Sequence, residues 1–130
     1  MRFLTVWMVC LIVVMAGCRP ANPPRAPGAG LSSSSLKARL EAALAITYSG
    51  DRDTALAAVA RDAARAAEAD VTKAALQRIT FTGAKDAAAA DCAVLLANAG
   101  QGAAANEVAK MITFTGTRDE ALKKLATGRR

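Results

Sequence analysis

The spacing of hydrophobic residues divides the chain into three segments. Residues 3–15 form an almost unbroken apolar run, and residues 19–35 contain all 4 prolines followed by a run of serines. From residue 36 onward, Leu, Ile and Val recur at scattered positions within alanine-rich sequence. Alanine, leucine, lysine, arginine and glutamate favour helices, whereas proline prevents them. The pattern predicts a helical domain over 36–130, preceded by a tether over 18–35.

The helical region contains an internal repeat. The segment 46–53 (Ile-Thr-Tyr-Ser-Gly-Asp-Arg-Asp) recurs as 79–86 (Ile-Thr-Phe-Thr-Gly-Ala-Lys-Asp) and as 112–119 (Ile-Thr-Phe-Thr-Gly-Thr-Arg-Asp), with the same spacing each time and without gaps. A fixed period of this length is typical of stacked units that cannot bury their apolar faces alone. We predict units at 34–66, 67–99 and 100–130.

Glycine and aspartate recur at fixed places in this repeat and predict where the helices end and begin. A glycine after each apolar segment suits the left-handed position past a helix C-terminus, and an aspartate shortly after it suits the N-cap of the next helix. The glycines are Gly50, Gly83 and Gly116, and the aspartates are Asp53, Asp86 and Asp119. Asp70 is expected to cap the third helix, and Gly100-Gln101-Gly102 to separate the fourth helix from the fifth. The predicted helices are 36–48, 53–67, 70–81, 86–98, 103–114 and 119–127.

These signals predict an all-α fold, a short α-solenoid of three 33-residue αα-hairpins. The unit length and two-helix form resemble tetratricopeptide-type helical repeats at the level of architecture. The segment 96–100 (Leu-Ala-Asn-Ala-Gly), ahead of Ala105 and Ala109, carries a faint version of that pattern. The bulky aromatic positions and closing proline of that family are missing, and the Thr-Pro-Leu-His signature of ankyrin repeats is absent.

Residues 1–18 have the layout of a secretory signal peptide. Arg2 supplies a positive charge, the apolar run follows, and the small residues Ala16 and Gly17 precede Cys18. The ending Met-Ala-Gly-Cys resembles the lipobox of bacterial lipoproteins. That resemblance implies cleavage after residue 17 and acylation of Cys18, for example with palmitate. The alternative is an uncleaved membrane anchor, but the apolar run is shorter than the ~20 residues that span a bilayer.

The same resemblance implies a location in the cell envelope. An acylated Cys18 would hold the protein at the cell membrane or outer membrane, facing the periplasm or the exterior. In such lipoproteins the residue after the cysteine influences sorting, and Arg19 is not the aspartate associated with inner-membrane retention. This favours the outer membrane if the source is Gram-negative. The Pro- and Ser-rich tether would let the folded part stand away from the membrane, because such sequence is extended or flexible.

The amino-acid composition argues against most kinds of catalytic and cofactor-binding site. The chain has no histidine, which excludes the commonest general base and metal ligand. It also lacks a paired-cysteine metal motif, a nucleophile elbow and a phosphate-binding glycine loop. Cys92 aligns with Val59 and Leu125 in the repeat, so we expect it to pack in the core rather than act as a nucleophile. We therefore expect no enzyme activity, no metal and no cofactor.

The formal net charge of +6 bears on the choice of partner. Basic and acidic residues are interleaved along the chain without a basic stripe, which argues against nucleic acid. In an envelope protein, a mild positive balance favours anionic lipid headgroups or acidic partners.

Stacked hairpins would align their loop residues along one edge. A candidate interaction ladder consists of Thr82, Lys85, Thr115 and Arg118. It could receive an extended peptide or a glycan, or its hydroxyls could simply satisfy local backbone groups. The aromatic residues Tyr48, Phe81 and Phe114 are expected to stack as a column between neighbouring hairpins.

The sequence thus predicts a lipid-anchored envelope protein that presents a helical repeat domain. The favoured function is a scaffold that binds an unidentified envelope protein. The alternative is a structural spacer without a dedicated partner.

Overall fold

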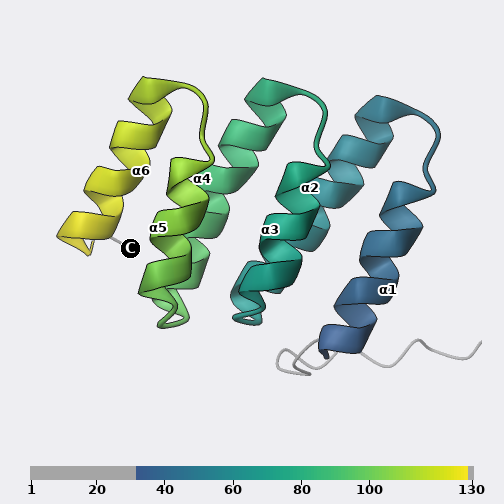
Figure 1. The fold of residues 1–130 in the computed structure, drawn as a ribbon, viewed down its shortest axis with the longest axis horizontal. Helices are drawn as coiled ribbons and strands as arrows, with labels where there is room; N and C mark the ends of the chain where they lie inside the picture. The colour runs from purple at the N-terminus through teal and green to yellow at the C-terminus, as the bar shows by residue number, and fades with distance from the viewer. Residues whose placement is uncertain (1–31, 129–130) are drawn as a thin grey trace, which may run out of the picture.

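The computed structural model describes residues 32–128, which form six α-helices and no strand (Figure 1). The fold is therefore all-α over this range, as the sequence predicts. The predicted signal peptide 1–17, the acylation site Cys18 and most of the tether lie outside the described residues. The helices are α1 (Ser33–Leu44), α2 (Ser49–Arg65), α3 (Ala69–Gln77), α4 (Thr82–Asn98), α5 (Gly102–Lys110) and α6 (Thr115–Thr127).

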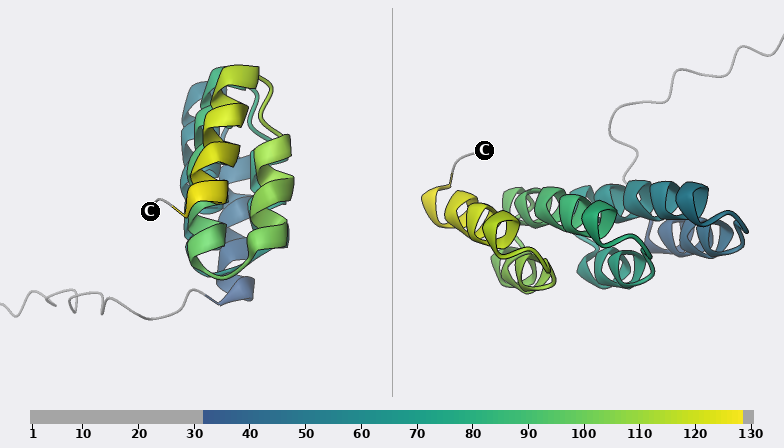
Figure 2. Two further views of the ribbon diagram at one scale, coloured as in Figure 1. Left: turned by 90° about the vertical axis from the view of Figure 1, so that its left-hand side faces the viewer. Right: turned by 90° about the horizontal axis from the view of Figure 1, so that it is seen from above.

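The helices lie in two rows. Seen from above, α2, α4 and α6 form one row, and α1, α3 and α5 form the other (Figure 2). Within the first row α4 packs against both α2 and α6, and across the rows α2 contacts α1 and α3 while α4 contacts α3 and α5. The loops that join α1 to α2, α3 to α4 and α5 to α6 all lie at the same end of the helices (Figure 1).

One continuous core built mostly from alanine runs along the stack. Its largest fully buried side chains include Leu36, Leu56, Leu76, Leu96 and Ile112. Fully burying a leucine stabilises a fold by about 1.5–3 kcal/mol, whereas alanine removes little apolar area from water. The core includes buried residues from all six helices.

The helix boundaries differ from the predicted ones in a regular way. The first helix of each pair ends at Leu44, Gln77 or Lys110, and the second begins at Ser49, Thr82 or Thr115. The Ile-Thr-aromatic segment is therefore a loop and not the last turn of a helix. Ile79 and Ile112 are buried in this loop and hold it against the core.

The expectation that the repeated glycines end a helix was wrong. Gly50, Gly83 and Gly116 are each the second residue of α2, α4 or α6, and none has a positive φ. The left-handed positions lie instead in the turns at the opposite end, at Ala67 (φ 60°) and Gly100 (φ 81°). These two residues occupy equivalent positions in successive units, and Gly100 separates α4 from α5 as predicted.

The predicted N-caps were also wrong. Asp53 and Asp86 lie inside α2 and α4, and Asp119 lies inside α6. Asp70 lies in the first turn of α3 rather than before it, where its carboxylate is 3.6 Å from the Lys73 ammonium. Among these helices α1 does have a side-chain cap, because the Ser32 hydroxyl accepts a hydrogen bond from the Ser35 N–H at 3.3 Å.

Within residues 32–128 none of the helices combines the length and the apolar character needed to cross a membrane.

Candidate functional site

Two buried carboxylates organise the loop end of the molecule. Asp53, only 2% exposed, accepts hydrogen bonds from the N–H groups of Thr80 (3.0 Å) and Phe81 (2.8 Å). Asp86 is equally buried and accepts from Thr113 (3.0 Å) and Phe114 (2.9 Å). Each aspartate thus holds the loop of the following helix pair. Because each carboxylate accepts two backbone N–H groups of one loop, these contacts fix the loop against the preceding helix pair.

The aromatic residues at these loops are on the surface. Tyr48 is 70% exposed, Phe81 55% and Phe114 58%. The expected stacked column between hairpins was therefore wrong. In the second and third loops the isoleucine two residues before the aromatic residue fills the interior position. Each aromatic residue directly precedes the first residue of α2, α4 or α6.

The structure places the predicted ladder at the same end of the helices. Thr82 and Thr115 are exposed in the first turns of α4 and α6, and Lys85 and Arg118 are half-buried one turn further on. At the corresponding place in α2, the Arg52 guanidinium donates to the Thr80 hydroxyl at 3.2 Å and so bridges to the next loop. Ligand binding by the ladder stays a prediction.

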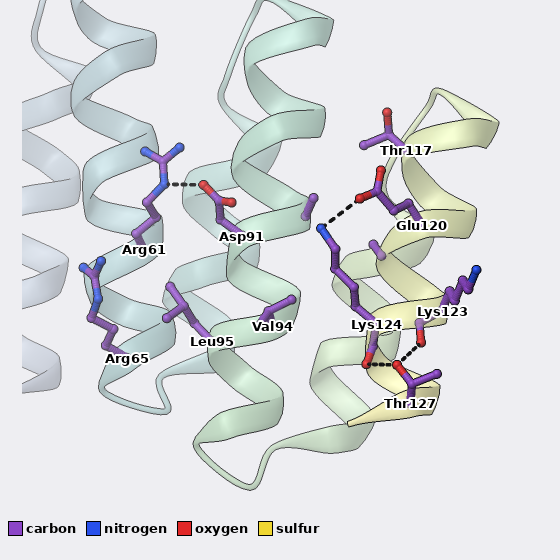
Figure 3. Close-up of a pocket in the computed structure, with 12 residues that line it drawn as sticks. Arg61, Arg65, Asp91, Val94, Leu95, Thr117, Glu120, Lys123, Lys124 and Thr127 are labelled. Carbon is purple, nitrogen blue, oxygen red and sulfur yellow. Dashed lines mark hydrogen bonds and ion pairs between the residues drawn. The ribbon is translucent and has the colours of Figure 1, made fainter. Parts of the chain in front are cut away.

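A hollow runs across the row formed by α2, α4 and α6. The sequence did not predict it. Its volume is about 880 Å³. In Figure 3 the side chains of α4 lie at its centre, with those of α2 on one side and those of α6 on the other. We call it the α4 groove. Its apolar lining comes from Ala90, Val94, Leu95 and Ala121, and its polar lining from Arg61, Arg65, Asp91, Thr117, Glu120, Lys123, Lys124 and Thr127.

Cations outnumber carboxylates along the α4 groove. Four basic side chains and two acidic ones line it. Arg61 pairs with Asp91 across α2 and α4 at 3.0 Å, Arg65 pairs with Asp62 at 2.9 Å, and Lys124 pairs with Glu120 at 2.9 Å. The hydrogen bond and charge of Lys124 lower the pKa of the Glu120 carboxyl. An apolar floor with a net positive rim suits an anionic segment that also carries apolar side chains.

The groove had no signal in the sequence because its residues do not repeat. Arg61, Val94 and Thr127 occupy equivalent positions in successive units, yet they differ in charge and size. The residues that recur in the sequence are mostly buried or lie in the loops, whereas most of the groove residues differ from one repeat to the next.

The thiol of Cys92 lies in the core, as its repeat position predicts. Burial raises its pKa to about 12, which leaves it protonated near neutral pH. Within residues 32–128 there is also no group of His, Cys, Asp and Glu side chains arranged to hold a metal ion.

Comparison of the chain with known protein families, curated proteins and solved structures gives no match.

Proposed function

We propose that the chain is a lipid-anchored envelope protein whose three αα-hairpin units form a short α-solenoid. The helix pattern supports the units: α2 and α4 each have 17 residues, α3 and α5 each have 9, and the members of both pairs begin at equivalent positions of the repeat. The buried aspartate that binds the next loop recurs with the same spacing, at Asp53 and Asp86.

Anchoring is supported by the first part of the sequence. The apolar run 3–15 ends in Ala16-Gly17-Cys18, and residues 19–31 lie between this segment and the cap of α1 at Ser32. The last residues of the predicted tether, 33–35, belong to the first turn of α1 instead. A single acyl chain holds a protein only marginally, whereas two or more hold it stably. Acylation of Cys18 and of the new N-terminus would therefore keep the helical domain at the membrane surface.

The function we assign to this domain is a scaffold for another envelope protein, and the α4 groove carries that assignment. Solenoids use their extended faces for binding. Here the floor formed by Val94 and Leu95 offers apolar contact. Lys123, the lining cation that pairs with no carboxylate within residues 32–128, offers a positive charge beside it. The partner of this proposal presents an acidic segment with apolar anchors.

Chemical crosslinking of intact envelopes followed by capture of the chain tests this function. We expect the wild-type chain to retain a partner in a fixed stoichiometry. The substitution Val94→Glu, which puts a carboxylate on the groove floor, should release that partner. The control Ala103→Glu, at an exposed position on α5 outside the groove, should retain it. Equal capture by both variants contradicts the groove assignment, and the absence of any stoichiometric partner favours a spacer.

A further inference from the structure

The first helix pair leaves open a face that the second pair buries. In α3, Val71 and Ala75 are buried. Their equivalents in α1, one repeat earlier, are Ala38 and Ala42, and both are exposed.

The loop isoleucine of the first pair is also less buried than its equivalents. Ile79 and Ile112 are buried, whereas Ile46 is only half-buried. We call this face, formed by Ala38, Ala42, Ile46 and the loop at Thr47 and Tyr48, the leading face.

The last helix, α6, also exposes positions whose equivalents in α2 and α4 are buried. The interior positions Ala60 and Ala93 are fully buried, whereas their equivalent Ala126 in α6 is exposed. Leu122 and Leu125 are only partly buried, and Asp119 is exposed although Asp53 and Asp86 are buried. We call this face, formed by Asp119, Leu122, Leu125 and Ala126, the trailing face. The two faces belong to α1 and α6, which lie at opposite ends of the set of six helices (Figure 1).

Repeat proteins normally close their ends with units whose outer faces are polar. Both faces here keep residue types of the interior instead. The exceptions include Lys123, which stands where the preceding units have Ala57 and Ala90, and Arg39, which stands where α3 has the buried Thr72. The two faces also carry complementary hydrogen-bonding groups: a carboxylate at Asp119 on the trailing face and the N–H groups of Thr47 and Tyr48 on the leading face. Within the range 32–128 no carboxylate accepts from the N–H groups of Thr47 and Tyr48, the equivalents of the two donors that Asp53 and Asp86 each bind.

We propose that copies of this chain dock head to tail, with the trailing face of one copy against the leading face of the next. Asp119 then accepts the N–H groups of Thr47 and Tyr48, as Asp86 does with Thr113 and Phe114. The occupant is a second copy because the contact continues the interface that already joins the helix pairs. Since the two faces differ, such a contact is heterologous and open-ended. The proposal rests on the repeat architecture proposed above.

Sedimentation of the full chain in detergent solution tests this docking through variants that block one face each. Ala42→Lys blocks the leading face and Ala126→Lys blocks the trailing face, both at exposed positions. We expect the wild type to form a concentration-dependent series of oligomers and each variant alone to stay monomeric. A mixture of the two should give a one-to-one dimer and nothing larger. A monomeric wild type, single variants that associate like the wild type, or a mixture that stays monomeric overturns the proposal.

A matched pair of aspartate substitutions separates the docking from the architecture on which it rests. Asp119→Asn should weaken association by about tenfold, because a charge-assisted acceptor is lost, and leave the melting temperature of the monomer unchanged. Asp86→Asn should lower that melting temperature. Unchanged association with Asp119→Asn overturns the docking alone. An unchanged melting temperature with Asp86→Asn contradicts the repeat architecture as well.

Discussion

The carboxylate of Asp86 accepts the backbone N–H of Phe114 at 2.9 Å, although the two residues belong to different helix pairs. Asp53 makes the corresponding bond to Phe81 at 2.8 Å. Each of these aspartates therefore holds the following loop, with the ring beside it exposed. The same geometry sets the start of α4 and α6, so one buried carboxylate positions both a loop and a helix.

Removing one of these acceptors should destabilise the fold. Asp86→Ala leaves the N–H groups of Thr113 and Phe114 without their acceptor, which should cost about 2–3 kcal/mol. For a domain of this size, that corresponds to a fall in melting temperature of roughly 10 °C or more. Asp119→Ala is the matched control, and in solution dilute enough to keep the chain monomeric its exposed side chain should change the stability by less than about 0.5 kcal/mol. Equal effects of the two substitutions in thermal unfolding contradict the assigned role of Asp86.

At the end of the helices opposite to these loops, two turn substitutions should change the free energy of unfolding in opposite directions. Ala67 and Gly100 occupy equivalent left-handed positions, where a β-carbon costs roughly 1–2 kcal/mol. Replacing the residue by glycine removes this cost, but part of the gain in stability is offset by the greater freedom of glycine in the unfolded chain. Ala67→Gly should therefore raise the free energy of unfolding by about 0.5 kcal/mol, and Gly100→Ala should lower it by a similar amount. Urea denaturation of both variants measures the two shifts, and shifts of the same sign refute the equivalence.

Gly83 should tolerate a side chain. It lies in the first turn of α4 with helical backbone, and a β-carbon built on it meets no atom within 4 Å. Gly83→Ala should raise stability by up to about 1 kcal/mol, because alanine is the better helix former. At Gly50 the new β-carbon comes within 3.1 Å of the Tyr48 ring, so Gly50→Ala should gain less. A clear loss of stability with Gly83→Ala would show that the residue is not helical.

Alkaline pH should weaken the core through Cys92. Its pKa is raised from 9.0 to about 12 by burial, so the folded state holds this proton more tightly than the unfolded chain. The corresponding stability is fully present below about pH 9 and is lost progressively as the pH rises towards 12. At pH 10.5 the loss should be about 1–2 kcal/mol. The variant Cys92→Val should lose less between pH 8 and 10.5 in denaturant titrations, and parallel pH curves would exclude this origin.

The sequence predicted the six helices, the break at Gly100 and the burial of Cys92, because each follows from local propensity or from position in the repeat. It misplaced the helix boundaries because Gly83 and Asp86 have the types and spacing of caps. Asp86 instead accepts hydrogen bonds from residues 27 and 28 positions away, which local rules do not detect. The exposure of Phe81 and the α4 groove follow from tertiary packing, and the residues of the groove vary between units.

The acylation of Cys18 is central to the proposed function, and metabolic labelling with a fatty-acid analogue tests it most directly. The wild-type chain and the control Cys10→Ser should both incorporate the label, since Cys10 lies within the segment that would be removed. Cys18→Ser should incorporate none and should keep residues 1–17. Label that persists in Cys18→Ser, or a wild-type chain that carries none, would contradict the assignment of this protein as a lipid-anchored envelope scaffold.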